Sequence, residues 1–268
     1  MARSALMNVM VQAAVKAGRG LARDFGEVQN LQVSVKGPGD FVSQADTRAE
    51  KILYDELQKA RPTFGFLMEE SGVKQGSDPQ SRWIIDPLDG TTNFLHGIPH
   101  FAISIALERQ GVITAGLIYN PVTDEMYTAE RGGGAFLNDR RLRVAARREL
   151  TDCVVSCGLP HLGRGDHGKF LIELRNVMNH VVGVRRGGAC SLDLAYVAAG
   201  RYDGYWENDL SAWDMAAGII LVREAGGFVS DLSGGAKMLD AGNIICGNEH
   251  IHKQLGDVVR TPFKPSQA

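Results

Sequence analysis

The stretch WIIDPLDGTTNFLH, residues 83–96, decides how the rest of the chain is interpreted. Its first residues, 83–85, form an apolar run that is long enough for a buried strand. Because Pro87 has no N–H group to extend a ladder, we expect that strand to end at the aspartate before it. Gly90 permits a tight turn or a close approach to a ligand, and the polar residues 91–93 can cap a helix. The stretch therefore predicts a strand, an acidic turn and a helix N-terminus in immediate succession.

This turn brings two carboxylates, Asp86 and Asp89, to the same point as the N–H groups of a helix N-terminus. Carboxylates bind hard cations, and N–H groups at a helix N-terminus bind phosphate. The combination suits a metal-assisted phosphate ester hydrolase. The same residues are also ordinary turn and capping chemistry, so the stretch alone leaves both interpretations open. Its spacing does not fit an EF-hand calcium loop, which has acids at alternate positions before its glycine.

The composition limits the possible partners and compartments. The chain has 268 residues, enough for one large domain or two smaller ones that share a cleft. With 29 Lys and Arg against 31 Asp and Glu, the net charge of −2 gives no reason to expect nucleic acid or an anionic membrane as the main partner. No apolar run approaches the roughly 20 residues that span a bilayer. The scattered cysteines form no C-x-x-C motif, which predicts reduced thiols and a cytoplasmic location.

The first half of the chain predicts two helices and an antiparallel sheet. Apolar residues recur at helical spacing up to Leu21, and a capping box at 47–50 predicts a second helix to about Arg61, with Asp46 just outside it. Apolar runs separated by turn residues then indicate an antiparallel meander. We expect strands at 31–35, 64–68, 83–85, 101–108, 112–119, 126–129, 135–137 and 142–144, and a loop at 36–40.

From about residue 147 the pattern changes to alternating strands and helices. We expect strands at 153–157, 181–184, 204–207, 228–231 and 243–246, and helices at 170–179, 191–199, 214–225 and 250–259. This divides the chain into an N-terminal α+β half, 1–146, and a C-terminal α/β half, 147–268. We expect the active site in the cleft between them, with most metal ligands on the first half and Asp214 and the substrate pocket on the second.

Four further acids lie at the ends of predicted elements. Asp46 precedes a helix, and Glu69 follows a strand. Glu207 ends a strand, and Asp214 opens an apolar helix. Each has an ordinary explanation, namely helix capping, complementarity with the helix dipole or simple solvation. Together with the acidic turn, however, they lie where α/β folds place ligands.

Three motifs in this order resemble the inositol monophosphatase family: MEES at 68–71, DPLDGTTN at 86–93 and WDMAAG at 213–218. The similarity extends to GNEH at 247–250, and the residues after the second motif are similar to the bacterial inositol-1-monophosphatase branch. The resemblance implies a layered α-β-α-β-α sandwich of the sugar-phosphatase type, a homodimer and a requirement for Mg²⁺. The sequence departs from the family at Met68, where glycine is common.

Matched motif to motif, the resemblance also implies the metal ligands. Glu69, Asp86 and the Leu88 carbonyl would hold a first ion. Asp86, Asp89 and Asp214 would hold a second, and Glu69 would contribute to a weaker third.

The implied substrate contacts come from both halves. The N–H groups of Gly90 and Thr91 would bind the phosphate. The Thr91 hydroxyl and Asp46 would polarise the attacking water, and the metal ligands Glu69 and Asp89 also count among the catalytic residues. Lys36 matches a lysine in a mobile loop over the site. Glu207 would bind a hydroxyl of the substrate alcohol. The other residues implied to contact the substrate are Gly188, Ala189, Cys190, Asp193 and Asp214. The GACS loop that supplies three of these varies within the family.

We therefore interpret the chain as a Mg²⁺-dependent phosphatase that hydrolyses inositol-1-phosphate with a metal-activated water. Two alternatives stay open. One is a phosphatase of another small sugar or nucleotide phosphate. The other is a family member that acts mainly as a regulatory partner of a nucleic-acid machine. The arginine cluster at 140–148 and the Arg185-Arg186 pair favour the latter, although both also fit a solvated or dimer surface.

The implied second ion, held by Asp86, Asp89 and Asp214, predicts inhibition by lithium. Li⁺ is close to Mg²⁺ in size but has half its charge, so it can take an oxygen-lined site without stabilising the leaving group equally. Because that site also depends on substrate oxygens, Li⁺ should bind after the ester is cleaved, and inhibition should be uncompetitive with substrate. Steady-state kinetics in LiCl, with NaCl at equal ionic strength as the control, measures this. Purely competitive inhibition, or none, would contradict the assignment.

Overall fold

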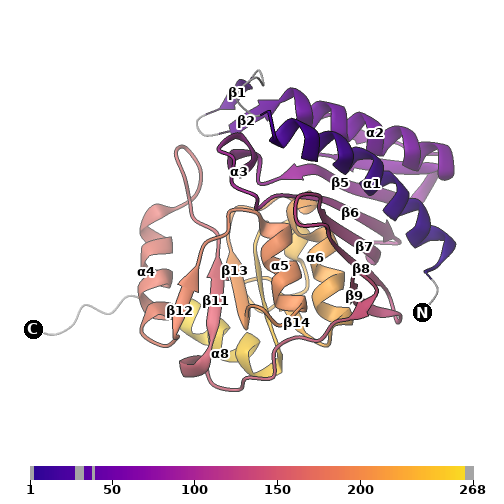
Figure 1. The fold of residues 1–268 in the computed structure, drawn as a ribbon. Coiled ribbons are helices and arrows are strands. Elements are labelled where there is room, and N and C mark those ends of the chain that lie inside the picture. Colours follow the sequence, from indigo (N-terminus) through magenta and orange to yellow (C-terminus); the bar gives the residue numbers. More distant parts are fainter. Residues whose placement is uncertain (1–2, 28–32, 38–39, 263–268) are drawn as a thin grey trace, which may run out of the picture.

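The computed structural model describes residues 3–27, 33–37 and 40–262, and no side chain between 28 and 43. In this part of the chain two β-sheets alternate with layers of helices (Figure 1). Each helical layer is a pair: α1 (Ala5–Phe25) with α2 (Gln44–Ala60), α5 (Cys190–Ala198) with α6 (Ala212–Glu224), and α4 (His167–Met178) with α8 (Glu249–Val259). The first pair covers the larger sheet, the second lies between the sheets, and the third covers the smaller sheet. The expected α-β-α-β-α sandwich is confirmed.

The larger sheet has the strand order β10-β9-β8-β7-β6-β5-β3-β4. All its neighbouring strands are antiparallel except β3 and β5, which run parallel. The predicted meander is therefore confirmed from β6 to β9, and β5 extends it by one strand. The strands are β3 (Phe64–Met68), β4 (Gly72–Lys74), β5 (Asp78–Asp89), β6 (Ala102–Arg109), β7 (Val112–Asn120), β8 (Glu125–Glu130), β9 (Gly134–Leu137) and β10 (Arg140–Arg141).

The smaller sheet is mixed, with the order β12-β11-β13-β15-β14. Its β11 runs parallel to both neighbours, whereas β15 is antiparallel to both of its own. The strands are β11 (Val154–Cys157), β12 (Gly183–Arg185), β13 (Gly204–Glu207), β14 (Phe228–Ser230) and β15 (Ile244–Gly247). The other described elements are a hairpin of β1 (Val33–Gly37) and β2 (Asp40–Ser43), the short helices α3 (Thr91–Leu95) and α7 (Met238–Ala241), and a 3₁₀ turn at Leu150–Asp152.

Strand β5 does not end before Pro87, as the sequence predicts, but continues to Asp89. Asp86 pairs with Ser104 and Asp89 with Ala102, so β5 carries one residue more than β6 over this interval. Such a β-bulge interrupts the ladder, and a proline without an N–H group is tolerated there. The bulge places both aspartates at the end of a continuous strand.

Helix α2 begins at Gln44, three residues before the predicted capping box, so Asp46 lies inside its first turn. The prediction was wrong because Glu50 has a tertiary partner: its Oε2 accepts a hydrogen bond of 2.8 Å from the N–H of Glu70. The carboxylate that suggested a cap instead attaches the helix to the end of β3. Helix α3 has the left-handed residue Gly90 as its N-cap, at φ 92°, and no side-chain cap.

Two predicted strands are displaced. Instead of the strand expected at 142–144, the structure has the short β10 just before it. The Leu142 N–H still donates a hydrogen bond of 2.8 Å to the Ala135 carbonyl. The strand expected at 31–35 is found at Val33–Gly37, and residues 31 and 32 lie outside the described residues. Of the expected loop at 36–40, residues 36, 37 and 40 belong to the hairpin strands.

Burial follows the layers. Along β5, Trp83 and Ile85 pack against α1 and α2, whereas Ile84 packs against α5 and α6 on the other face. The cluster between the sheets contains residues from both sides of position 146, so the two halves share a core and the division there stays a prediction. Even the longest described helix, α1, buries only one face, and no helix in the described ranges is long and apolar enough to cross a membrane.

Gly116 on β7 lies where the larger sheet closely approaches α6, which leads to a stability prediction. A Cβ atom there would lie 2.5 Å from Ile220 Cγ2 and 2.8 Å from the Ala217 carbonyl oxygen. Because that carbonyl is helix backbone, Gly116→Ala should lower the free energy of unfolding by roughly 1–3 kcal/mol. Gly20→Ala in α1 is the control, since a Cβ there meets nothing within 4 Å and alanine favours a helix. Urea denaturation followed by circular dichroism should move the two variants in opposite directions. Equal stability of Gly116→Ala and the wild type would contradict the close approach.

Candidate active site

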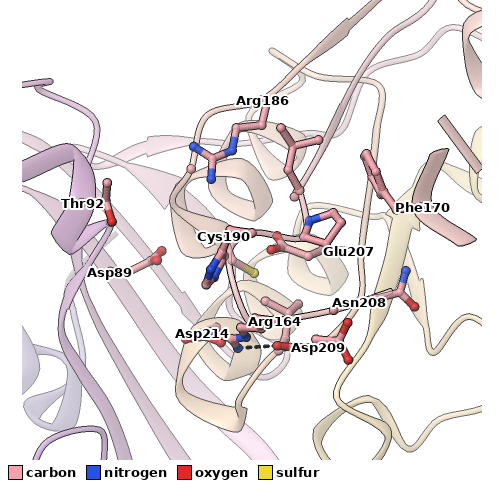
Figure 2. A pocket seen from close by; sticks show the side chains of 18 of the residues that line it. Asp89, Thr92, Arg164, Phe170, Arg186, Cys190, Glu207, Asn208, Asp209 and Asp214 are labelled. Atoms are coloured by element: carbon pink, nitrogen blue, oxygen red, sulfur yellow. Dashed lines mark hydrogen bonds between the residues drawn. The ribbon is translucent and has the colours of Figure 1, made fainter. Parts of the chain in front are cut away.

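A pocket of about 850 Å³ opens at the ends of β3, β5 and β13 and the start of α6. Figure 2 shows Asp89 and Thr92 on its N-terminal side, facing Cys190, Glu207 and Asp214 from C-terminal elements. Of the residues that the sequence singled out, those that line it are Glu69, Asp86, Leu88, Asp89, Gly90, Thr91, Gly188, Cys190, Glu207 and Asp214. Residues from both predicted halves thus meet at one pocket.

The acids of the N-terminal side lie together because β3 and β5 are parallel. Glu69 directly follows β3 and donates its N–H to the Ile85 carbonyl at 3.2 Å, so it lies beside the end of β5. Parallel strands deliver their carboxyl ends to the same edge of a sheet, where ligands bind in α/β folds. The bulge in β5 then adds Asp86 and Asp89 to that edge.

Asp86 is the most deeply buried of these acids, with 1% of its surface exposed. Burial raises its pKa well above the usual range, and the charges of Glu69, Asp89, Asp214 and Asp46 raise it further. Its Oδ1 accepts a hydrogen bond of 2.9 Å from the Leu88 N–H, which fixes its direction. Four acidic side chains therefore act on one buried carboxyl group.

The pKa values of Asp89 and Asp214 are also raised, with burial as the largest cause for both. Burial and the charge of Asp214 raise the pKa of Asp89 to about 7, although hydrogen bonds from Ser191 oppose the shift. Burial raises the pKa of Asp214 to about 6, while the Ser211 N–H, which donates to its Oδ2 at 2.7 Å, opposes it. Asp214 thus caps α6, as its position suggested, and also lines the pocket.

The donor set of this site fits a hard divalent cation. Mg²⁺ prefers oxygen ligands, above all carboxylates, and a bound cation would favour the charged forms of these acids, which burial and, for Asp86 and Asp89, neighbouring carboxylates disfavour. Carboxylate oxygens of Asp46, Glu69 and Glu70 lie within 4.8 Å of one another at one edge of the cluster. Glu70 had no predicted role, although two adjacent acids at the end of a strand were a signal for it.

Thr91 connects the acidic cluster to the turn that precedes α3. Its hydroxyl lies 3.0 Å from the Leu88 carbonyl and 3.4 Å from Asp46 Oδ2, so it can donate to either. Gly90 must be glycine here, because its φ of 92° is left-handed and a Cβ would lie 3.0 Å from the His100 carbonyl oxygen. The turn therefore exposes backbone N–H groups close to the acids.

Glu207 lies on the wall of the pocket opposite the acidic cluster. Its Oε2 accepts a short hydrogen bond from the Tyr205 hydroxyl, and burial raises its pKa to about 8. Gly158 provides the room for it, since a Cβ there would lie 1.8 Å from Glu207 Cδ. Nearby, burial raises the pKa of the Cys190 thiol well above its usual range, so this cysteine is neutral at physiological pH.

Four of the residues that the sequence singled out do not line the pocket. Asp46 lies behind Thr91, to which it is connected by the contact described above. Ala189 and Asp193 are each 1% exposed, and Asp193 Oδ1 accepts a hydrogen bond of 3.0 Å from Ser156. Ala189 is the N-cap of α5 and Asp193 lies in its first turn, and both side chains are in the core. That these two face the substrate alcohol stays a prediction. Lys36 lies in β1, and its side chain is outside the described residues.

Basic residues that sequence reasoning did not assign to the site also line the pocket. Arg164 belongs to a loop after β11 and donates to the Asp209 carbonyl (Figure 2). Lys169 Nζ donates to Asn208 Oδ1 at 3.1 Å. Arg186 lies at the pocket rim and is exposed. The sequence had suggested that it belongs to a solvated surface, a dimer surface or a surface that contacts a nucleic-acid machine. The glycines at 158, 163 and 165 were the one available signal for this loop.

The chain is similar to known proteins over almost its whole length. A family model, the inositol monophosphatase family, matches residues 2–261. The inositol-1-monophosphatase of Mesorhizobium japonicum is 71% identical over 263 residues, which are 98% of this chain and 99% of that protein. The Nus factor SuhB of Pseudomonas aeruginosa is 43% identical, over 97% of this chain and 98% of its own. The crystal structure of the extragenic suppressor protein suhB from Bartonella henselae matches with a TM-score of 0.95 and 66% identity, covering 97% of this chain and 100% of that one. The chain therefore belongs to the inositol monophosphatase family.

Proposed function

We propose that the protein is a Mg²⁺-dependent phosphomonoesterase that hydrolyses inositol-1-phosphate to inositol and phosphate. The observation that carries this proposal is the crowding of carboxylates around Asp86, next to the exposed turn at Gly90 and Thr91. Relatives that are 69% and 71% identical are named inositol-1-monophosphatase, which supports the choice of substrate.

The proposed ligands of the first cation are Glu69, Asp86 and the Leu88 carbonyl, and those of the second are Asp86, Asp89 and Asp214. Glu69 would also contribute to a third, weaker site, for which the nearby Asp46 and Glu70 offer further oxygens. When bound, the cations would polarise the phosphoryl oxygens, acidify a water and stabilise the leaving alkoxide.

The chain's own residues then have three tasks. Thr91 and Gly90 offer N–H groups to the phosphate, and the Thr91 hydroxyl orients the attacking water. Asp46, 3.4 Å from that hydroxyl, accepts the proton that the water releases through it. The neutral thiol of Cys190 is a poor nucleophile, which argues against a cysteinyl-phosphate and supports the proposed attack by water.

The alcohol side of the pocket is formed by Gly188, Cys190 and Glu207. Glu207 would hydrogen-bond a hydroxyl of the polyol, since its Tyr205 partner occupies only Oε2. The exposed Arg186 also lines the pocket and adds a positive charge that a neutral polyol does not need. Arg186 therefore favours another small sugar or nucleotide phosphate as the second candidate substrate.

A regulatory role beside a nucleic-acid machine is a further candidate. Relatives that are 42% and 43% identical are named Nus factor SuhB. The arginines at 140, 141, 143, 147 and 148 are exposed, although Arg147 already pairs with Asp203 at 3.0 Å. The acidic pocket argues for catalysis in addition to any such role. A homodimer and a cytoplasmic location remain proposals that rest on the family resemblance and the composition.

The proposed function is tested by measuring phosphate release from polyol, sugar and nucleotide monophosphates. Activity should require Mg²⁺, be lost in EDTA and be highest with inositol-1-phosphate. Asp86→Asn, Asp89→Asn and Asp214→Asn should each abolish turnover, because the charge that recruits the cation is removed, while thermal melting shows that the fold remains. Near wild-type kcat in any of the three at saturating Mg²⁺ would contradict the ligand assignment.

The role of the Thr91 hydroxyl leads to a separate prediction. Thr91→Ala should lower kcat by roughly 10²–10³-fold, which is what one positioned polar group usually contributes. KM should change little if the hydroxyl acts mainly in the transition state. Thr91→Ser retains the hydroxyl and is the matched control, with most of the activity preserved. A change confined to KM would reassign Thr91 to substrate binding.

A further inference from the structure

Asp89 is connected to the C-terminal half by Ser191, a residue to which neither the sequence motifs nor the proposed mechanism gives a role. Both the N–H and the hydroxyl of Ser191 donate to Asp89 Oδ2, the N–H at a distance of 2.7 Å. Ser191 is fully buried, at 0% exposure, and is the second residue of α5. The two partners are 102 residues apart in the sequence, so the contact is purely tertiary.

This anchoring differs from that of the other two ligands proposed for the second cation. Asp86 accepts from the Leu88 N–H two residues away, and Asp214 from the Ser211 N–H three residues away. Their directions are therefore set by local backbone. Asp89 alone of the three depends on a hydroxyl and on the docking of another element.

The same junction has a second connection. Asn93, which is 4% exposed, donates its Nδ2 to the His100 carbonyl at 2.7 Å and to the Gly187 carbonyl at 3.0 Å. It thereby attaches α3 to the loop before α5. Ser191 and Asn93 together hold the start of α5 against the acidic edge of the larger sheet, so Ser191 meets Asp89 in a fixed position.

We propose that Ser191 is a positioning residue that fixes the Asp89 carboxylate for the second cation. The proposal rests on the ligand assignment made under the proposed function. A carboxylate close to other negative charges rotates away from them unless donors hold it, and two donors on one oxygen fix both its plane and its direction. Partners that orient a metal ligand in this way commonly affect metal affinity by roughly 10–100-fold.

The test measures cation binding without turnover. Mn²⁺ titrated into the wild-type protein is followed by electron paramagnetic resonance of the free ion, and Mg²⁺ is used as the competitor. Ser191→Ala removes the hydroxyl but keeps the N–H, and should weaken the weaker class of Mn²⁺ sites by roughly 10–100-fold. At saturating Mg²⁺ its kcat should recover most of the wild-type value, because only occupancy is affected.

Two further variants separate hydrogen bonding from packing. Ser191→Cys keeps the size of the side chain but offers only a weak donor, so it should lose affinity as Ser191→Ala does. Ser156→Ala is the matched control: Ser156 is also 0% exposed and also donates to a carboxylate, that of Asp193, which does not line the pocket. Its cation affinity should equal that of the wild type.

The outcomes are distinguishable from a failure of the proposed function. The positioning role is overturned if Ser191→Ala binds Mn²⁺ with wild-type affinity, even if the protein is an active phosphatase. If the alanine variant does not fold, the same result in Ser191→Cys overturns it. Equal losses in Ser191→Ala and Ser156→Ala also overturn it, because they indicate a general loss of packing. A wild-type protein that binds Mn²⁺ but hydrolyses no monoester contradicts the proposed function and leaves the Ser191 comparison intact.

Discussion

The candidate site depends on the mutual repulsion of carboxylates around one buried aspartate. Asp86 is 1% exposed, and the charges of Glu69, Asp89, Asp214 and Asp46 add to the effect of burial in raising its pKa. Buried like charges destabilise a folded chain unless protons or a cation neutralise them. This fold nevertheless fixes these carboxylates with backbone and hydroxyl donors. Groups that cost stability but are held in place are expected at a functional site.

The topology explains how these acids meet. Among the described strands of the larger sheet, β3 and β5 are the one parallel pair, and they carry Glu69 and Asp86 to the same edge. The bulge in β5 adds Asp89 at that edge, and α6 brings Asp214 from between the two sheets. Because helices cover both faces of the larger sheet, the edge is the place where these polar groups can open to a pocket.

Most of the fold and the acidic half of the site could be predicted from the sequence, because strand patterns and three motifs determine them. What could not be predicted depends on tertiary contacts. The start of α2 was misplaced because Glu50 bonds to Glu70 and not to its own helix. Asp193 was expected in the pocket, but the register of α5 turns it toward Ser156. Arg186 could be recognised as basic, although only the arrangement of the loops places it at the pocket rim.

The two walls of the pocket differ in charge, and this difference bears on the substrate. The wall formed by β3, β5 and α6 carries the carboxylates that need a cation. On the other wall, burial is the main cause that raises the pKa of Glu207 to about 8 and that keeps the Cys190 thiol neutral. A largely protonated Glu207 can donate a hydrogen bond to a hydroxyl without attracting a cation of its own. Under the proposed function, a polyol hydroxyl next to Cys190 and Glu207 therefore meets uncharged groups, whereas Arg164, Lys169 and Arg186 place positive charge elsewhere along the pocket.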